Sequence, residues 1–373
     1  MTPTAPTSAA PAALRQHNFS AGPGALPTEV LEEVREEFPV YPGLGSSIVE
    51  VSHRSAAYTE ITERAVGRLR SLLGLGDAWH VLFLQGGASM QFHQVPMNLL
   101  KAGETADYLD TGEWARKAVK EAKIVAAMRG AHVNVAASSA EAGYTYIPPP
   151  SEWRMTPGAA YLHYTSNNTI YGTEYDAPPR TDAPLVCDAS SDFLSRPVDY
   201  DRHLVVYAGA QKNIGPAGAT VVLVHDDAQG HVADLPTMLD YQTHTAKLFN
   251  TPPVFAVYMI DKVLGWIERN GGLEGIAERN RAKADHLYGA LDASDFYRPT
   301  VREDSRSLMN VCFRLPSEDL EARFIAEAKN AGLLALKGYR TVGGVRASIY
   351  NAVELESVQA LVAFMRHFEA RNG

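Results

Sequence analysis

The sequence predicts an α/β fold, with a mainly parallel sheet in a large domain and a smaller α/β domain at the C-terminal end. Helical and strand-like segments alternate from about residue 25 onward, as in layered α/β proteins. The glycine pair Gly271 and Gly272 ends a long helical segment. A further long helix, then strand, helix, strand and helix complete the chain. We therefore expect a mobile tail over 1–16, an N-terminal segment and large domain over 17–268, and a small domain over 269–373.

The tail is expected because its first sixteen residues are rich in Ala, Pro, Thr and Ser and can bury little surface. These residues lack the apolar core and clustered positive charge of a targeting signal. The first helix is expected over 27–38, where apolar residues have helical spacing and the first half is acidic. A second helix over 55–75 repeats apolar residues at intervals of three and four and ends in a glycine stop.

Strand-like runs follow at 80–84, 185–190, 203–207 and 219–225, and helices are expected over 86–100 and 252–272. In the small domain, strands are expected at 309–315 and 345–351, each followed by a helix, over 317–333 and 353–372.

Composition excludes several classes of protein. The chain has 373 residues and a formal net charge of -9, which argues against a general nucleic-acid binder. Its two cysteines, Cys187 and Cys312, lie in apolar runs and provide neither a disulfide scaffold nor a cysteine-rich metal site. No apolar run reaches the ~18 residues of a membrane span. We therefore expect a cytoplasmic protein that binds neither membrane nor metal.

Three features in order along the chain indicate chemistry. The run FLQGGAS (83–89) ends a strand in two glycines before a helix, where backbone N–H groups can approach a phosphate. Asp188 ends the strand LVCD, at the edge where open α/β sheets bind ligands. Lys212 follows the strand HLVVY, among glycines and alanines. Taken singly, these features could be a geometric turn, a capping acid and a surface lysine.

Together they are what an enzyme that uses pyridoxal 5′-phosphate needs. A lysine amine can hold the cofactor aldehyde as a Schiff base and later move the α-proton of the substrate. An acid beside the pyridine nitrogen keeps that nitrogen protonated, so that the ring accepts electrons. Small neighbours such as Ala208, Gly209 and Gly215 would leave room for the ring.

Nine blocks of sequence resemble the phosphoserine aminotransferase family, which has fold type I. They are NFSAGPGALP, VSHRS, FLQGGASMQF, VPMNLL, DYLDTGEWARKAVKEAK, CDASSDFLSRP, YAGAQKNIGPAG, NTPPVFAVY and VGGVRASIYNA, and they span nearly the whole chain. The resemblance implies that Lys212 is the Schiff-base lysine, Asp188 the partner of the pyridine nitrogen and Trp114 the residue stacked on the ring. It also implies a homodimer with shared active sites. The other implied cofactor contacts are Ala88, Ser89, Thr169 and Gln211, with Asn250 and Thr251 reaching the phosphate of the partner subunit.

The implied reaction converts 3-phosphohydroxypyruvate and L-glutamate to O-phospho-L-serine and 2-oxoglutarate, in serine biosynthesis. These anionic substrates need fixed cations, and arginine can bind carboxylate or phosphate bidentately. By resemblance, Arg346 holds the α-carboxylate, while His53, Arg54 and Arg340 receive the phosphate or the side-chain carboxylate. Use of 4-phosphohydroxythreonine, a substrate in vitamin B6 synthesis, stays open.

One position departs from the family. Tyr339 precedes Arg340 where many members have histidine, and a tyrosine hydroxyl brings no positive charge near neutral pH. Three alternative functions share part of this pattern. They are another fold-type-I aminotransferase such as serine or alanine:glyoxylate aminotransferase, a cysteine desulfurase, and a non-catalytic scaffold. The apolar settings of both cysteines argue against the desulfurase, and the joint presence of lysine, acid and arginines argues against the scaffold.

Overall fold

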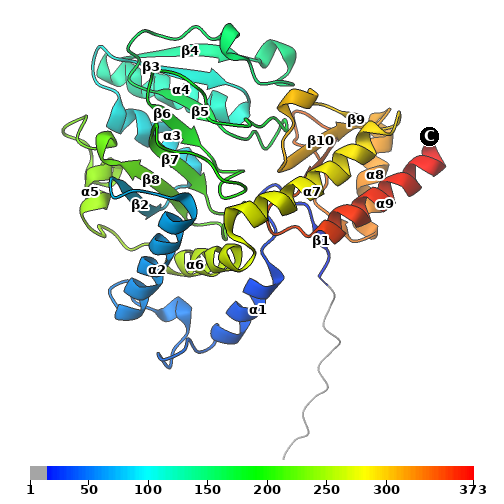
Figure 1. Ribbon diagram of the computed structural model, residues 1–373, viewed down its shortest axis with the longest axis horizontal. Coiled ribbons are helices and arrows are strands. Elements are labelled where there is room, and N and C mark those ends of the chain that lie inside the picture. Colours follow the sequence, from blue (N-terminus) through cyan, green and yellow to red (C-terminus); the bar gives the residue numbers. More distant parts are fainter. Residues whose placement is uncertain (1–14) are drawn as a thin grey trace, which may run out of the picture.

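The computed structural model describes residues 15–373, so the tail expected over 1–16 lies outside the described residues except for its last two. The predicted α/β class is confirmed. A large unit is built on a sheet, and a smaller unit lies beside it (Figure 1). Within the described residues, no helix is both long and apolar enough to cross a membrane.

The main sheet of the described chain has seven strands in the order β2-β8-β7-β6-β5-β3-β4. Five of them, from β7 to β4, run parallel, whereas β8 is antiparallel to both of its neighbours, β7 and β2. The strands are β2 (Trp79–Leu84), β3 (Thr105–Asp110), β4 (His132–Ser138), β5 (Leu162–Thr165), β6 (Leu185–Asp188), β7 (His203–Gly209) and β8 (Thr220–His225).

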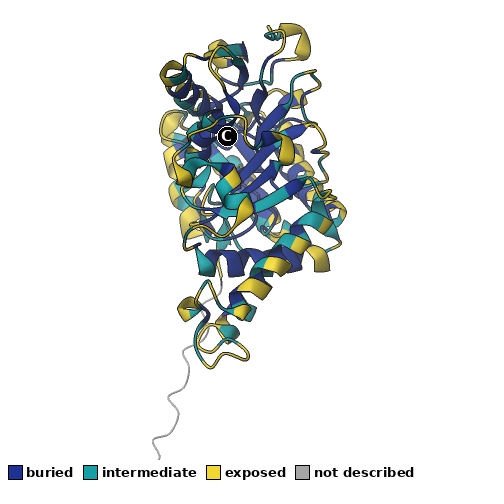
Figure 2. Cartoon of the chain, turned by 90° about the vertical axis from the view of Figure 1, so that its left-hand side faces the viewer, coloured by how far each residue is buried: buried dark blue, intermediate teal, exposed yellow. Residues whose placement is uncertain are grey.

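Helices cover both faces of this sheet. Alternate strand residues face opposite sides because the side-chain period of a strand is two. Val205 and Tyr207 belong to one apolar cluster together with α3 (Gly87–Leu99) and α4 (Glu113–Arg129), whereas Val206 and Ala208 belong to another with α2 (Ala56–Leu73) and α6 (Val254–Arg269). The central strands are accordingly buried, while exposed residues lie on the outer helices and loops (Figure 2). Two further helices of the large unit are α1 (Thr28–Glu37) and the short α5 (Tyr241–Ala246).

The smaller unit has its own apolar cluster. Its sheet has the order β12-β10-β9 and packs with three helices. Its elements are α7 (Gly272–Asp292), β9 (Arg298–Pro299), β10 (Asn310–Arg314), α8 (Glu318–Asn330), β12 (Val345–Ser348) and α9 (Leu355–Asn372). Helix α7 joins the two units, since Leu273 and Ile276 belong to the first cluster and Ala284 and Leu287 to the second.

The N-terminal segment also lies on the smaller unit. Strand β1 (His17–Asn18) pairs in parallel with β11 (Leu333–Leu334), and Phe19 is buried in the second cluster. The segment therefore reaches the C-terminal part of the chain before it enters α1. The division into 17–268 and 269–373 stays a prediction.

Candidate active site

The carboxyl ends of six strands, all but β8, lie at one edge of the main sheet. Strand β2 runs in the same direction as β7 because β8 is antiparallel to both. The turns that follow β2, β3, β5, β6 and β7 therefore lie at the same edge, where α/β sheets bind their ligands. At or next to these turns lie, in chain order, Ala88 and Ser89 at the start of α3, Trp114 at the start of α4, Thr169, Asp188 at the end of β6, and Lys212.

The Lys212 amine is buried at the centre of this edge. Its Nζ donates a hydrogen bond to Thr169 Oγ1 at 2.6 Å and lies 5.8 Å from the centre of the Trp114 ring. The pKa of Lys212 is lowered from 10.5 to about 8. Burial is the main cause, the charge of Arg346 acts in the same direction, and the charge of Asp188 opposes both. An amine with such a pKa is partly neutral near physiological pH, as a nucleophile or general base must be.

Asp188 is a buried acid at the end of β6. Its Oδ1 accepts a hydrogen bond from the backbone N–H of Ser190 at 3.0 Å. Burial raises the pKa of Asp188, while the Ser190 side chain and the positive charge of Lys212 lower it. The carboxylate is therefore held in place to accept a hydrogen bond from a positively charged N–H group.

Trp114 and Arg346 each have a buried nitrogen without a hydrogen-bond partner among residues 15–373, namely Trp114 Nε1 and Arg346 Nε. Arg346 lies on β12 and donates from Nη1 to the backbone oxygen of Thr169 at 3.3 Å. Thr169 thus touches both the lysine and the arginine. Buried unpaired donors are rare in native proteins, and here they leave free hydrogen-bonding capacity at the site.

The turn after β2 leads directly into α3. Gly86 and Gly87 have φ values of 92° and 65°, in the left-handed region that glycine adopts readily. Ala88 is half-buried and Ser89 exposed in the first turn of α3. The free N–H groups and positive dipole end of this helix suit an anion.

Asn250 and Thr251 lie beside the strand that leads into this turn. Asn250 Nδ2 donates to Gln85 Oε1 at 3.2 Å, and Gln85 Nε2 donates to the backbone oxygen of Thr251 at 2.7 Å. Their expected contact with the phosphate of a partner subunit stays a prediction.

The segment around Gly24 covers Lys212, and sequence reasoning gave it no role. The Gly24 N–H donates to the backbone oxygen of Gln211 at 2.7 Å. A Cβ atom on Gly24 would lie 2.8 Å from the Lys212 oxygen and 2.8 Å from the Tyr350 ring. The close approach therefore requires glycine, and the run GPG in NFSAGPGALP was the available signal.

Within residues 15–373, the remaining expected substrate residues make no hydrogen bond or ion pair with the groups around Lys212. His53 is half-buried, while Arg54 and Arg340 are exposed. In the described part of the chain, none of these three side chains has a hydrogen bond or ion pair with another residue.

Comparisons with known proteins agree with this geometry. The aminotransferase class-V family model matches residues 16–361. The phosphoserine aminotransferase of Desulfatibacillum aliphaticivorans is 53% identical over 364 residues, which cover 96% of this chain and 99% of the relative.

Two solved structures are similar throughout. The phosphoserine aminotransferase of Bacillus circulans subsp. alkalophilus superposes with a TM-score of 0.92 at 51% identity, covering 96% of this chain and 99% of the other. The phosphoserine aminotransferase of Trichomonas vaginalis, solved with bound pyridoxal phosphate, has a TM-score of 0.89 at 38% identity, covering 94% and 100%.

Proposed function

The chain belongs to the class-V aminotransferase family, and on that premise we propose that it transfers the amino group of L-glutamate to 3-phosphohydroxypyruvate. The products are O-phospho-L-serine and 2-oxoglutarate, which places the enzyme in serine biosynthesis. The observation that carries the proposal is the buried Lys212 amine, held by Thr169 between the Trp114 ring, the Asp188 carboxyl and the Arg346 guanidinium.

The residues present fit pyridoxal phosphate. The unpaired Trp114 Nε1 lies in the wall of the site, and Lys212 is an amine of lowered pKa. Lys212 and Asp188 would hold the aldehyde and ring-nitrogen ends, the start of α3 the phosphate, and Trp114 the ring face. When bound, the cofactor would supply an aldehyde for a lysine Schiff base and a ring that draws electrons from the substrate α-carbon.

The side chains then have separate tasks. Lys212 Nζ removes the α-proton of the amino-acid donor and, in the second half-reaction, delivers a proton to the α-carbon derived from the keto acid, while Thr169 Oγ1 fixes the position of that nitrogen. The Asp188 carboxylate holds a proton on a facing ring nitrogen. The Arg346 guanidinium, with Nε still free, binds the α-carboxylate and so sets the orientation of the α-carbon.

We also propose that the enzyme is a homodimer whose sites are shared. Two supporting groups of exposed apolar side chains lie near expected site residues in the sequence. The first, ahead of His53 and Arg54, comprises Phe38, Val40, Leu44 and Val49, and the second, ahead of Asn250, comprises Leu248 and Phe249. Such exposed apolar groups are typical of subunit interfaces. A cytoplasmic location is supported by Cys187 and Cys312, which are both free thiols.

An absorption measurement tests the function directly. The purified chain loaded with pyridoxal phosphate should show a band near the visible range that glutamate removes and 3-phosphohydroxypyruvate restores. If only an unphosphorylated keto acid such as pyruvate or glyoxylate restored the band, the rival aminotransferase function would replace the proposed one. If no band formed, the scaffold interpretation would replace both.

A further inference from the structure

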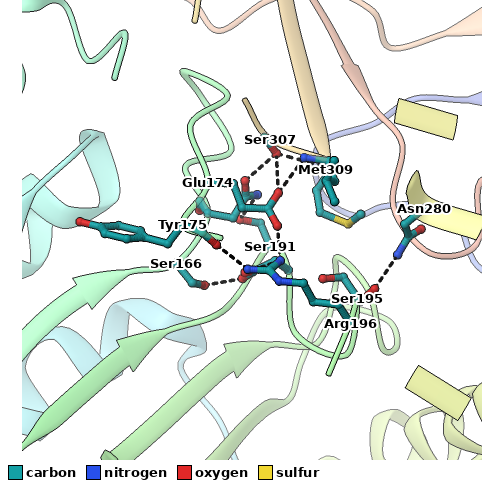
Figure 3. A network of polar contacts seen from close by, with 12 residues as sticks. Ser166, Glu174, Tyr175, Ser191, Ser195, Arg196, Asn280, Ser307 and Met309 are labelled. Atoms are coloured by element: carbon teal, nitrogen blue, oxygen red, sulfur yellow. Dashed lines mark hydrogen bonds and ion pairs between the residues drawn. The ribbon is translucent and has the colours of Figure 1, made fainter. Parts of the chain in front are cut away.

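A network of buried polar groups lies beneath the loop 166–175, which carries Thr169 (Figure 3). At its centre is Arg196, whose Nη1 pairs with Glu174 Oε1 and lies 3.6 Å from Asp192 Oδ2. Its Nη2 donates to the backbone oxygen of Tyr175 at 2.5 Å. One guanidinium therefore joins the turn after β6 to the end of the loop.

The other end of the loop is held by the same turn. The Ser166 hydroxyl donates to Asp192 Oδ1, and the Ser166 backbone N–H donates to the backbone oxygen of Asp188 at 3.0 Å. Tyr175 N–H donates to the Ser166 oxygen at 2.8 Å, which closes the loop at its base. Thr169 lies within this closed loop.

The network also reaches the strand next to Arg346. Glu174 Oε2 accepts from the backbone N–H of Leu308 at 2.7 Å and from Ser307 Oγ at 3.2 Å. These residues lead into β10, which pairs with β12, where Arg346 lies. Glu174 thus links Arg196 to the loop that carries Thr169 and to the segment of the smaller unit that precedes β10.

A buried ion pair commonly adds little stability beyond what apolar packing of the same volume would give, and in some proteins its role is to specify one geometry. Arg196 touches none of the groups assigned to the reaction. We propose that Arg196 is a positioning residue: it fixes the loop 166–175 so that Thr169 meets both Lys212 Nζ and Arg346. This inference rests on the proposed function, because the effect is read through the aminotransferase reaction.

The experiment compares R196Q and R196K with wild type, all loaded with pyridoxal phosphate. R196Q should lower kcat about 10- to 100-fold, since small misplacements of reacting groups have effects of this size. R196K should fall between the two, because lysine keeps the charge but cannot fork between Glu174 and the Tyr175 oxygen. The dissociation constant of the cofactor, measured by its absorption, should rise in the same order.

R68Q is the matched control. Arg68 also lies between two carboxylates, with Nη1 2.6 Å from Asp261 Oδ1 and Nε 3.0 Å from Glu268 Oε2, but it joins α2 to α6. R68Q should lower the unfolding midpoint without lowering kcat per folded molecule. A fall in kcat equal to that of R196Q would mean that any lost ion pair has this effect, and the proposal would fail.

A double-mutant cycle separates positioning from general destabilisation. If Arg196 acts through Thr169, adding R196Q to T169A should lower kcat by less than about twofold, because coupled residues are non-additive. Additive effects, or wild-type kcat and cofactor affinity in R196Q, would overturn the proposal. If R196Q does not fold, E174Q replaces it in the cycle with the same outcomes, since glutamine can still accept from Leu308. Failure of the proposed function would instead appear as inactivity of the wild-type chain.

Discussion

The edge of the sheet at Lys212 and the two exposed arginines, Arg54 and Arg340, differ in how firmly their side chains are held within one chain. At the sheet edge, Lys212, Thr169 and Asp188 are buried and make short hydrogen bonds, such as the 2.6 Å bond from Lys212 Nζ to Thr169 Oγ1. By contrast, both arginines are exposed. The difference teaches that a single chain preorganises the groups for proton transfer, whereas the cations proposed for the second anionic group are not held in place by contacts within the chain.

The largest effect should come from Lys212→Ala. Loss of the amine removes both the covalent anchor and the proton carrier, so the rate of each half-reaction should fall at least about 10³-fold. Stopped-flow absorption with glutamate measures it. The control is Lys283→Met, at the other deeply buried lysine, which donates to the backbone oxygens of Ile349 and Tyr350 and should keep the absorption band. Retained transamination in Lys212→Ala would refute the assignment.

Arg346→Lys tests the arginine that belongs to the buried region. A lysine keeps the charge but loses the bidentate fork, so kcat/KM should fall roughly 30- to 100-fold for glutamate and 3-phosphohydroxypyruvate alike. Arg340→Lys should instead spare small substrates that carry only an α-carboxylate, such as alanine in a slow half-reaction. Equal loss with every substrate in both variants would erase the distinction between the two regions.

Mixing two inactive chains tests whether the exposed region is completed by a second subunit. Lys212→Ala supplies an intact Arg54, and Arg54→Gln supplies an intact Lys212. In a shared-site dimer, one site of each hybrid regains both residues, so random reassociation should restore about a quarter of wild-type activity. Each variant refolded alone is the control. No recovery, with hybrids verified by differently tagged chains, would mean that Arg54 serves its own chain's site.

The buried region was also the better predicted from sequence. Lys212 and Asp188 each follow or end an apolar run that predicts a strand. Because neighbouring strands of a parallel sheet end at the same edge, the sequence also predicted that these two residues lie close together. Trp114 and Thr169, by contrast, were reached only through family resemblance. Strands β3, β4 and β5 were not predicted individually, because runs such as TADYLD mix polar with apolar residues although β3 is largely buried.

Other features depend on contacts between segments far apart in the sequence. Nothing in the local pattern shows that His17 and Asn18 pair with Leu333 and Leu334. Likewise, the sequence around Arg196 shows only a charged residue before a proline. Its ion pair with Glu174 is formed by the folded chain and has no local sequence signal. Period and turn chemistry predict single elements, but they carry no information about which distant residue supplies a partner.

A pH titration tests, by stability rather than activity, a buried lysine that lies outside both regions. Burial lowers the pKa of Lys283 to about 7, below its ordinary 10.5, so between these values the folded chain binds fewer protons than the unfolded chain. The stability that Lys283 contributes is therefore present above about pH 10.5 and is lost as pH falls towards 7. The unfolding free energy of cofactor-free wild type minus that of Lys283→Met should fall by a few kcal/mol over this window and then level off. A flat difference would mean that the amine stays charged in the folded chain.

The smallest effect is expected at Tyr339, at the edge of the open region beside Arg340. Tyr339→His would add a side chain that is protonated below about pH 6.5, next to the arginine proposed to receive the substrate phosphate. The KM for 3-phosphohydroxypyruvate should therefore fall about two- to fivefold at pH 6 and change little at pH 8, where imidazole is neutral. The KM for glutamate, whose side-chain carboxylate carries a smaller charge, should respond less at either pH. Tyr339→Phe is the control, because it removes the hydroxyl without adding charge. If Tyr339→His and Tyr339→Phe behaved alike at pH 6, the charge at this position would have no part in phosphate recognition, and Arg340 would have to act without it.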